Sequence, residues 1–140
     1  MNLLAPATAA HDILDPGLFE AIADDTPANA LAREQAELIL RKGFRTEIDS
    51  YSVFFENDHT TRTGLAAYLR ERNLSRVFLV GLAYDYCVGY SALDAQRSKI
   101  PAAVLRDACR AIDLHGSAAA MEARFAEAGV ALIDTSELSG

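Results

Sequence analysis

The sequence predicts an α/β fold in which a parallel β-sheet is covered by flanking helices. From residue 37 onward, short apolar runs of strand length alternate with amphipathic stretches of helix length, and this alternation is typical of such sheets. The chain has 140 residues, of which 51% are hydrophobic and 24% are charged. These values fit one compact domain with a hydrophobic core of its own.

The individual elements follow from this alternation. We expect strands at residues 37–41, 77–80, 102–106 and 130–133, and helices at residues 63–72, 87–97 and 117–128. Thr63 and Ser117 are expected to cap the helices that they begin, because a hydroxyl at a helix start can accept a hydrogen bond from a free backbone amide. Gly129 is expected to end the last helix.

Residues 1–30 differ from the rest of the chain. They are rich in Ala, Asp, Pro and Thr, with one short helical stretch at residues 16–23 and no convincing strand. We therefore expect a divergent, loosely packed segment over residues 1–30, followed by a partial α/β domain over residues 31–140.

Charge and cysteine content narrow the class of function. A formal net charge of -7 argues against nucleic acid and anionic membrane surfaces as partners, because both select for clustered Lys and Arg. No run approaches the ~18 apolar residues of a membrane-spanning helix. The 2 cysteines form no disulfide framework, so we expect a cytoplasmic protein that acts on a small molecule.

Cys87 is the first candidate for catalysis. It follows the apolar run at residues 77–80 after a short turn and opens the helix expected at residues 87–97. The partial positive charge of a helix N-terminus favours the thiolate, the nucleophilic form of cysteine. Lys42 follows a second expected strand and Asp107 a third. Since ligands collect beyond the carboxyl ends of parallel strands, a thiol and an ammonium group can be delivered to one pocket.

Several linked motifs, in this order, resemble the second half of the nicotinamidases, a branch of the isochorismatase-like cysteine hydrolases. The resemblance extends over residues 30–138, and its motifs are RKGF at 41–44, IDSYSVFFEND at 48–58, TGL at 63–65, GLAYDYCV at 81–88 and DACRAI at 107–112. It implies the three-layer, Rossmann-like fold of that family. In this chain, the N-terminal strands of that fold are expected to be missing.

The resemblance also implies a chemistry. Cys87 would attack the carboxamide carbon of nicotinamide, releasing ammonia and leaving a thioester that water cleaves to nicotinic acid. Lys42 would be the second member of the family's Asp, Lys and Cys triad. The backbone amides of Ala83 and Cys87 would form the oxyanion hole, with a non-proline cis peptide between Leu82 and Ala83.

Aromatic side chains near these motifs could hold a flat pyridine ring. Tyr51, Phe54 and Tyr86 are the candidates, because stacking orients a ring and excludes water. Tyr51 and Phe54 could equally be core residues.

Three further residues are interpreted as structural. Asp85 lies in the turn before Cys87 and is expected to accept hydrogen bonds from backbone amides. Asp49 is expected to be a turn or anchoring group. Cys109 is expected to be a structural thiol.

The chain departs from the family's pattern upstream of Lys42. The family places its acid/base Asp on an early strand, and it binds a divalent metal (zinc, iron or manganese) through an Asp-x-His motif and a further His. We find neither segment in this sequence. The residues that could replace the missing acid and metal ligands fit these roles poorly. They are Asp12, Asp15, Asp24, Asp25, His11, His59 and His115. The histidines are interpreted as surface residues, and no metal ligand is predicted.

Two functions of different classes follow. The first is a nicotinamidase-type amide hydrolase, active only if the missing acid and metal ligands come from elsewhere. The expected partners are a missing N-terminal half or further copies in a homo-oligomer. The second is a catalytically silent remnant that binds a partner chain through an open sheet edge.

Overall fold

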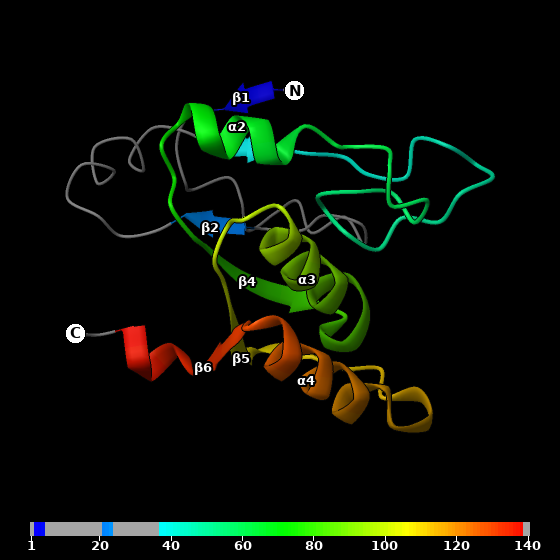
Figure 1. The fold of residues 1–140 in the computed structure, drawn as a ribbon, viewed down its shortest axis with the longest axis vertical. Helices are drawn as coiled ribbons and strands as arrows, with labels where there is room; N and C mark the ends of the chain where they lie inside the picture. The colour runs from blue at the N-terminus through cyan, green and yellow to red at the C-terminus, as the bar shows by residue number, and fades with distance from the viewer. Residues whose placement is uncertain (1, 5–20, 24–36, 139–140) are drawn as a thin grey trace.

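The structure is a computed structural model that describes residues 2–4, 21–23 and 37–138. Its strands are β1 (Asn2–Leu4), β2 (Ala21–Ala23), β3 (Glu37–Ile39), β4 (Val77–Leu82), β5 (Ala102–Arg110) and β6 (Ala131–Ile133) (Figure 1). Its α-helices are α2 (Leu65–Glu71), α3 (Gly89–Arg97) and α4 (Ser117–Ala128). Shorter helical turns are η2 (Tyr84–Val88), η3 (Leu114–Gly116) and η4 (Thr135–Leu138).

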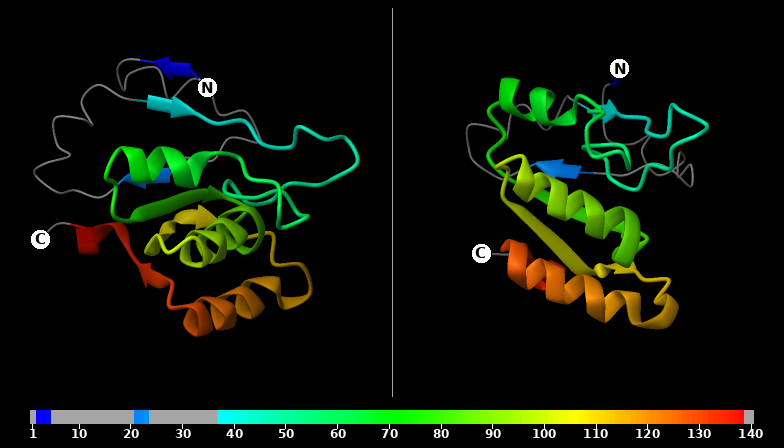
Figure 2. Two further views of the ribbon diagram at one scale, coloured as in Figure 1. Left: turned by 45° about the horizontal axis from the view of Figure 1, so that its top comes forward. Right: turned by 45° about the vertical axis from the view of Figure 1, so that its right-hand side comes forward.

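The main sheet has 4 strands in the order β2-β4-β5-β6. Strands β4, β5 and β6 are parallel, and β2 pairs antiparallel with β4. Helices α3 and α4 pack against each other and contact this sheet, so that they cover it as a second layer (Figure 2). The predicted α/β fold, a parallel sheet with flanking helices, is confirmed.

The pairing of β4 with β5 is interrupted near the carboxyl end of β4. Leu79 pairs with Val104, but Gly81 pairs with Cys109, so β5 advances further than β4 between these two pairs. This bulge leaves residues 106–108 exposed within β5. Because β5 continues to Arg110, the residue Asp107 lies inside the strand, whereas the sequence had placed it just beyond the strand's end.

The strand expected at residues 37–41 is present, but its place in the fold was predicted wrongly. Strand β3 pairs antiparallel with β1 in a separate sheet of 2 strands and does not join the parallel sheet. Residues 21–23, expected to end a helix, form strand β2, and β1 is also a strand where none was expected. The rest of the helix expected at 16–23 lies outside the described residues. These short strands form because of pairing partners that lie far away in the chain. The local sequence pattern therefore does not predict the strands.

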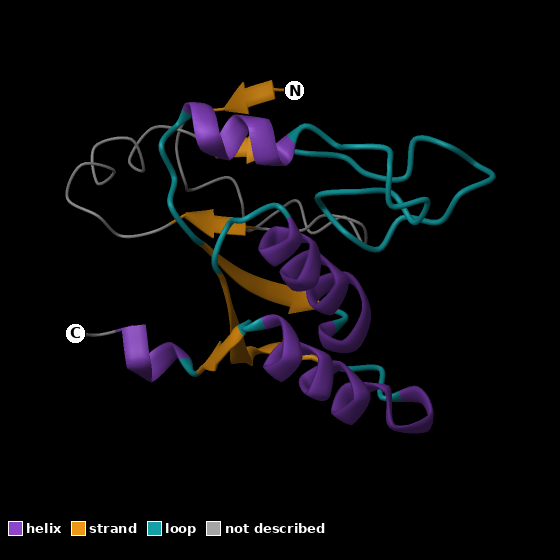
Figure 3. Cartoon of the chain, in the orientation of Figure 1, coloured by secondary structure: helices purple, strands orange, loops and turns teal. Residues whose placement is uncertain are grey.

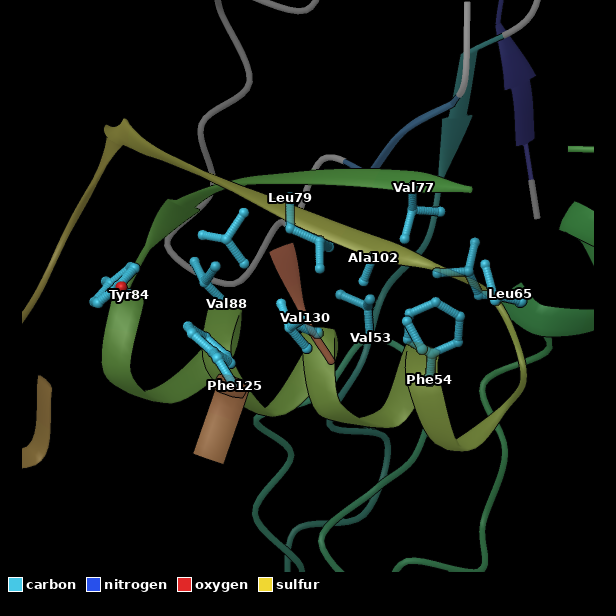
Figure 4. Close-up of a cluster of buried hydrophobic side chains, with 14 of the residues drawn as sticks. Val53, Phe54, Leu65, Val77, Leu79, Tyr84, Val88, Ala102, Phe125 and Val130 are labelled. Atoms are coloured by element: carbon cyan, nitrogen blue, oxygen red, sulfur yellow. The ribbon is translucent and has the colours of Figure 1, made fainter. Parts of the chain in front are cut away.

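The core lies between the sheet and its helices. Val77 and Leu79 of β4 and Val88 of η2 are fully buried, as is Phe125 of α4. Figure 4 shows these side chains pointing into one cluster with Phe54, which comes from the loop before α2. This packing fixes the carboxyl end of β4 relative to η2 and α3, and so fixes the position of Cys87.

Three of the expected helix signals differ in the structure. Gly64 and not Thr63 occupies the cap position of α2, although the Thr63 hydroxyl accepts a hydrogen bond from the Leu65 amide at 3.3 Å. The helical segment expected to open at Cys87 begins earlier, with the π-helical turn η2, and Cys87 lies inside that turn. Ser117 does not cap α4, since Gly116 occupies the cap position and the Ser117 hydroxyl donates to Asp85. Gly129 ends α4 in a left-handed conformation, as predicted.

A long loop precedes α2. From Leu40 to Gly64 the chain has no helix or strand apart from an isolated bridge between Phe55 and Arg62 (Figure 3). Within the described residues, no helix is long and apolar enough to cross a membrane.

Candidate active site

The candidate site is built at the carboxyl end of β4. The strand runs through Leu82 to Ala83, and the peptide bond between these two residues is cis, as the resemblance implied. The carbonyl of Ala83 accepts hydrogen bonds from the amides of Tyr86 and Val88 at 3.1 and 3.0 Å. These bonds close the η2 turn, which presents Cys87 with its side chain partly exposed.

Lys42 reaches Cys87 from the long loop. Its ammonium nitrogen Nζ lies 3.8 Å from the Cys87 sulfur, although 45 positions separate the two residues. The same nitrogen donates a hydrogen bond to the carbonyl of Ser50 at 2.5 Å. A cation beside a cysteine favours the thiolate by Coulomb attraction. The structure therefore brings together the thiol and the ammonium group that the sequence singled out.

Ser91 joins the loop to the helix that carries the thiol. Its hydroxyl donates to the carbonyl of Cys87 at 2.6 Å and accepts from the amide of Val53 at 3.0 Å. Ser91 is fully buried. Since Lys42 is bonded to the nearby Ser50, these contacts fix the loop, and with it the ammonium group, against the turn of Cys87. Sequence reasoning missed Ser91, although a serine one helical turn after the cysteine was a readable signal.

An aromatic cluster lies beside the thiol. The ring centroids of Tyr51 and Tyr86 are 5.7 Å apart, and Tyr51 stacks on Tyr90 at 5.6 Å. Tyr90 belongs to the first turn of α3 and was not predicted. The Arg124 guanidinium lies 4.9 Å from the Tyr90 ring centroid, which fixes that ring from the other helix.

Phe54 does not join this cluster. It is 2% exposed, and Figure 4 places it near Leu65 and Val77, toward the amino end of β4. Of the two interpretations of Phe54, pocket residue or core residue, the structure agrees with the core residue.

Asp85 anchors the loop after β5. Its carboxylate is 2% exposed and accepts hydrogen bonds from the amides of Ile112 and Asp113 at 3.0 and 2.8 Å and from the Ser117 hydroxyl at 2.5 Å. Burial alone would raise the pKa of Asp85, but these hydrogen bonds outweigh burial and the pKa lies below its ordinary value. Asp85 is thus an anchor that stays ionised, as the sequence suggested.

The other candidates have structural contacts of their own. Cys109 is buried in β5, and burial raises its pKa. Asp107 accepts hydrogen bonds from the amide and the hydroxyl of Thr135. The Asp49 carbonyl accepts from the amide of Asn57, in agreement with a structural role in the loop.

This fold and site identify the family of the chain. The model of the isochorismatase domain matches residues 20–137. The chain belongs to this family.

Among its relatives are nicotinamidases. The nicotinamidase of Acinetobacter baylyi is 51% identical over 88 residues, which cover 63% of this chain and 41% of that protein. A solved nicotinamidase/pyrazinamidase of Acinetobacter baumanii is 48% identical, with a TM-score of 0.72, and the match covers 74% of this chain and 50% of that one. PnC1 from L. infantum, solved in complex with nicotinate, is 38% identical with a TM-score of 0.65, over 69% of this chain and 48% of that one. The chain thus spans about half the length of these relatives or less.

The described residues do not fit a metal ion. Within residues 2–4, 21–23 and 37–138, no group of three or more His, Cys, Asp and Glu side chains could hold a metal. His59 and His115 are exposed and separate. The remaining acids and the histidine that the sequence offered as substitutes lie outside the described residues: His11, Asp12, Asp15, Asp24 and Asp25.

Cys87 is expected to react with iodoacetamide at least ~10-fold faster than Cys109 at neutral pH, because only the thiolate reacts and Cys109 is buried with a raised pKa. Mass spectrometry of the digested protein over a time course would measure both rates. Equal rates would contradict the activation of Cys87 by its surroundings.

Replacing Ser91 by Ala is expected to lower the free energy of unfolding by about 1–3 kcal/mol, because the Val53 amide and the Cys87 carbonyl would lose a buried partner. Urea unfolding would measure the loss. Ser91→Thr keeps the hydroxyl and should restore most of the stability. If both variants lost the same amount, the hydroxyl would not be the connection described above.

Asp85→Asn is expected to lower the free energy of unfolding by about 1–3 kcal/mol at pH 7, since an amide cannot replace a carboxylate that accepts three hydrogen bonds. Because the folded pKa is lowered, the carboxylate stabilises the fold above its ordinary pKa of 3.8, and this contribution is lost as the pH falls through the folded value. Urea unfolding at pH 7 and pH 2.5 should show the difference shrinking in acid. The same change at the exposed Asp134 is the control, and a pH-independent difference at Asp85 would contradict the assignment.

Proposed function

We propose that this chain is the cysteine-bearing part of a nicotinamidase-type amide hydrolase, which converts nicotinamide to nicotinic acid and ammonia. The observation that carries the proposal is the 3.8 Å contact between Lys42 Nζ and Cys87 Sγ at the carboxyl end of β4. It is supported by relatives that carry the name nicotinamidase and by a relative solved with nicotinate.

In this proposal Cys87 acts as the nucleophile. Its thiolate forms a bond to the carboxamide carbon, and the electron pair of the carbonyl moves to the oxygen. The backbone amides of Ala83 and Cys87 would donate to that oxyanion, an interaction that grows as charge develops and so lowers the barrier. Collapse of the intermediate expels ammonia once its nitrogen has gained a proton, and water then cleaves the thioester to the acid.

Lys42 would act on the sulfur rather than on the amide. Its ammonium group lies next to Sγ and is fixed by the Ser50 carbonyl, so it stabilises negative charge at the attacking atom. Tyr51 and Tyr86 would bind the pyridine ring, with Tyr90 stacked behind Tyr51.

The proton donor is not assigned to a described residue. Asp85 is fully engaged with amide and hydroxyl donors, so it is not free to transfer a proton. We propose that the acid and the ligands of any divalent metal come from a further polypeptide segment. The site of action in this proposal is the cytoplasm.

The protein would be assayed for release of ammonia and nicotinic acid from nicotinamide, with and without added Zn²⁺, Mn²⁺ or Fe²⁺. Cys87→Ala is expected to reduce the rate at least ~10³-fold, because the nucleophile is lost, and Lys42→Ala on the order of 10²-fold. Cys109→Ala is the matched control and should leave the rate within about twofold.

Nicotinamide should also protect Cys87, but not Cys109, from alkylation. This readout tests binding even where the proton donor is missing from the assay. Activity that survives in Cys87→Ala would overturn the proposal, as would the absence of both turnover and protection.

A further inference from the structure

A second site candidate lies far from Cys87. A hollow of about 480 Å³ opens between the loop before α2 and the ends of α2 and α3. It is lined by residues that precede β4 and β5, at the amino ends of these strands. Cys87 follows the carboxyl end of β4, and a strand of 6 residues such as β4 spans roughly 20 Å. The hollow is therefore distinct from the candidate active site.

The lining of this hollow is strongly basic. Four cationic side chains, those of Arg62, Arg70, Arg97 and Lys99, contribute to it, and within the part of the chain that the structure describes no carboxylate lines it. The chain as a whole carries a formal charge of -7. Placing several cationic side chains close together costs electrostatic energy unless a negatively charged group lies nearby.

The guanidinium groups are held in position. Arg62 and Arg97 both lie over the ring of Phe55, at 5.6 and 5.0 Å from its centroid. Arg97 also donates to the Asp94 carboxylate at 3.1 Å and to the His59 carbonyl at 3.4 Å. Each guanidinium has five N–H donors, so these contacts leave donors available. Fixed donors bind an anion with a smaller loss of side-chain entropy.

The attraction of a cation to a helix C-terminus does not explain all four cationic side chains of the hollow. Arg70 and Arg97 lie in the last turns of α2 and α3, where a cation complements the helix dipole. Arg62 and Lys99 lie outside both helices. The carbonyls at the end of α3 are already used: Asp94, Ala95 and Gln96 accept from backbone amides at 2.9 Å. The side chain of Lys99 is therefore not needed to satisfy them.

We propose that this hollow binds a small anion that bears phosphate groups. Guanidinium groups match the geometry of phosphate oxygens and bind them through paired hydrogen bonds. Thr60 and Ser98 add hydroxyl groups to the lining, so nearly every polar group there can donate. The volume exceeds that of one phosphate and lies in the range of small-molecule sites, which favours a diphosphate or a nucleotide.

Titration calorimetry with inorganic pyrophosphate tests the proposal on the full chain. We expect saturable binding that weakens as salt is raised. Lys99→Gln and Arg62→Gln should each weaken it about tenfold, since each removes a charged partner of the anion. Arg124→Gln is the matched control, because Arg124 also lies over an aromatic ring but contacts Tyr90 outside the hollow. It should change the affinity less than twofold.

Two results would overturn the proposal. One is the absence of saturable binding at low salt. The other is equal weakening by Arg124→Gln, which would mean diffuse attraction without a site. Lys99 is exposed, so its variant should fold, and unfolding curves would check this. The alkylation rate of Cys87 should stay unchanged in the Lys99 and Arg62 variants, which separates this proposal from the proposed hydrolase activity.

Discussion

The contact between the Lys42 ammonium group and the Cys87 sulfur is the interaction on which the candidate site depends. It links a loop without regular structure to the turn after β4, across 45 positions of the sequence. The contact itself is too weak to hold these parts together. Ser91 and the packed core around Val53 and Val88 supply that rigidity. The chemistry thus rests on a short network of buried hydrogen bonds.

Local patterns of apolar residues in the sequence predicted the strands and helices that pack around the common hydrophobic core. Strands β4 and β5 and the three α-helices lie close to their expected positions, because apolar periodicity encodes which face of each element is buried. The partner of β3 could not be predicted, since it is β1, a strand of three residues at the N-terminus in which no strand pattern is visible. The bulge in β5 could not be predicted either, because it depends on how β5 pairs with β4.

The site was predicted only in part. Cys87 follows the carboxyl end of β4, where ligands collect in parallel sheets. Lys42 follows β3, which does not belong to the parallel sheet, and it reaches the sulfur through the long loop. Tyr90 was missed because its importance comes from stacking on Tyr51, a contact that no spacing reveals. Ser91 was missed although it lies one helical turn after Cys87. The basic hollow is a stronger example, since three separate segments meet to form it. Its arginines and lysine look like ordinary surface charges in the sequence.

The bulge in β5 has a consequence for how the sheet opens. At the amino end, Val77 to Leu79 pair regularly with their neighbours in β5, whereas beyond Leu79 the ladder is broken for several residues of β5. Unpaired backbone exchanges its hydrogens readily and separates at low energetic cost. Breathing motions of the sheet should therefore concentrate at this break, before pairing resumes at Gly81 and Leu82. The regular pairs from Val77 to Leu79 keep the core closed while the break opens.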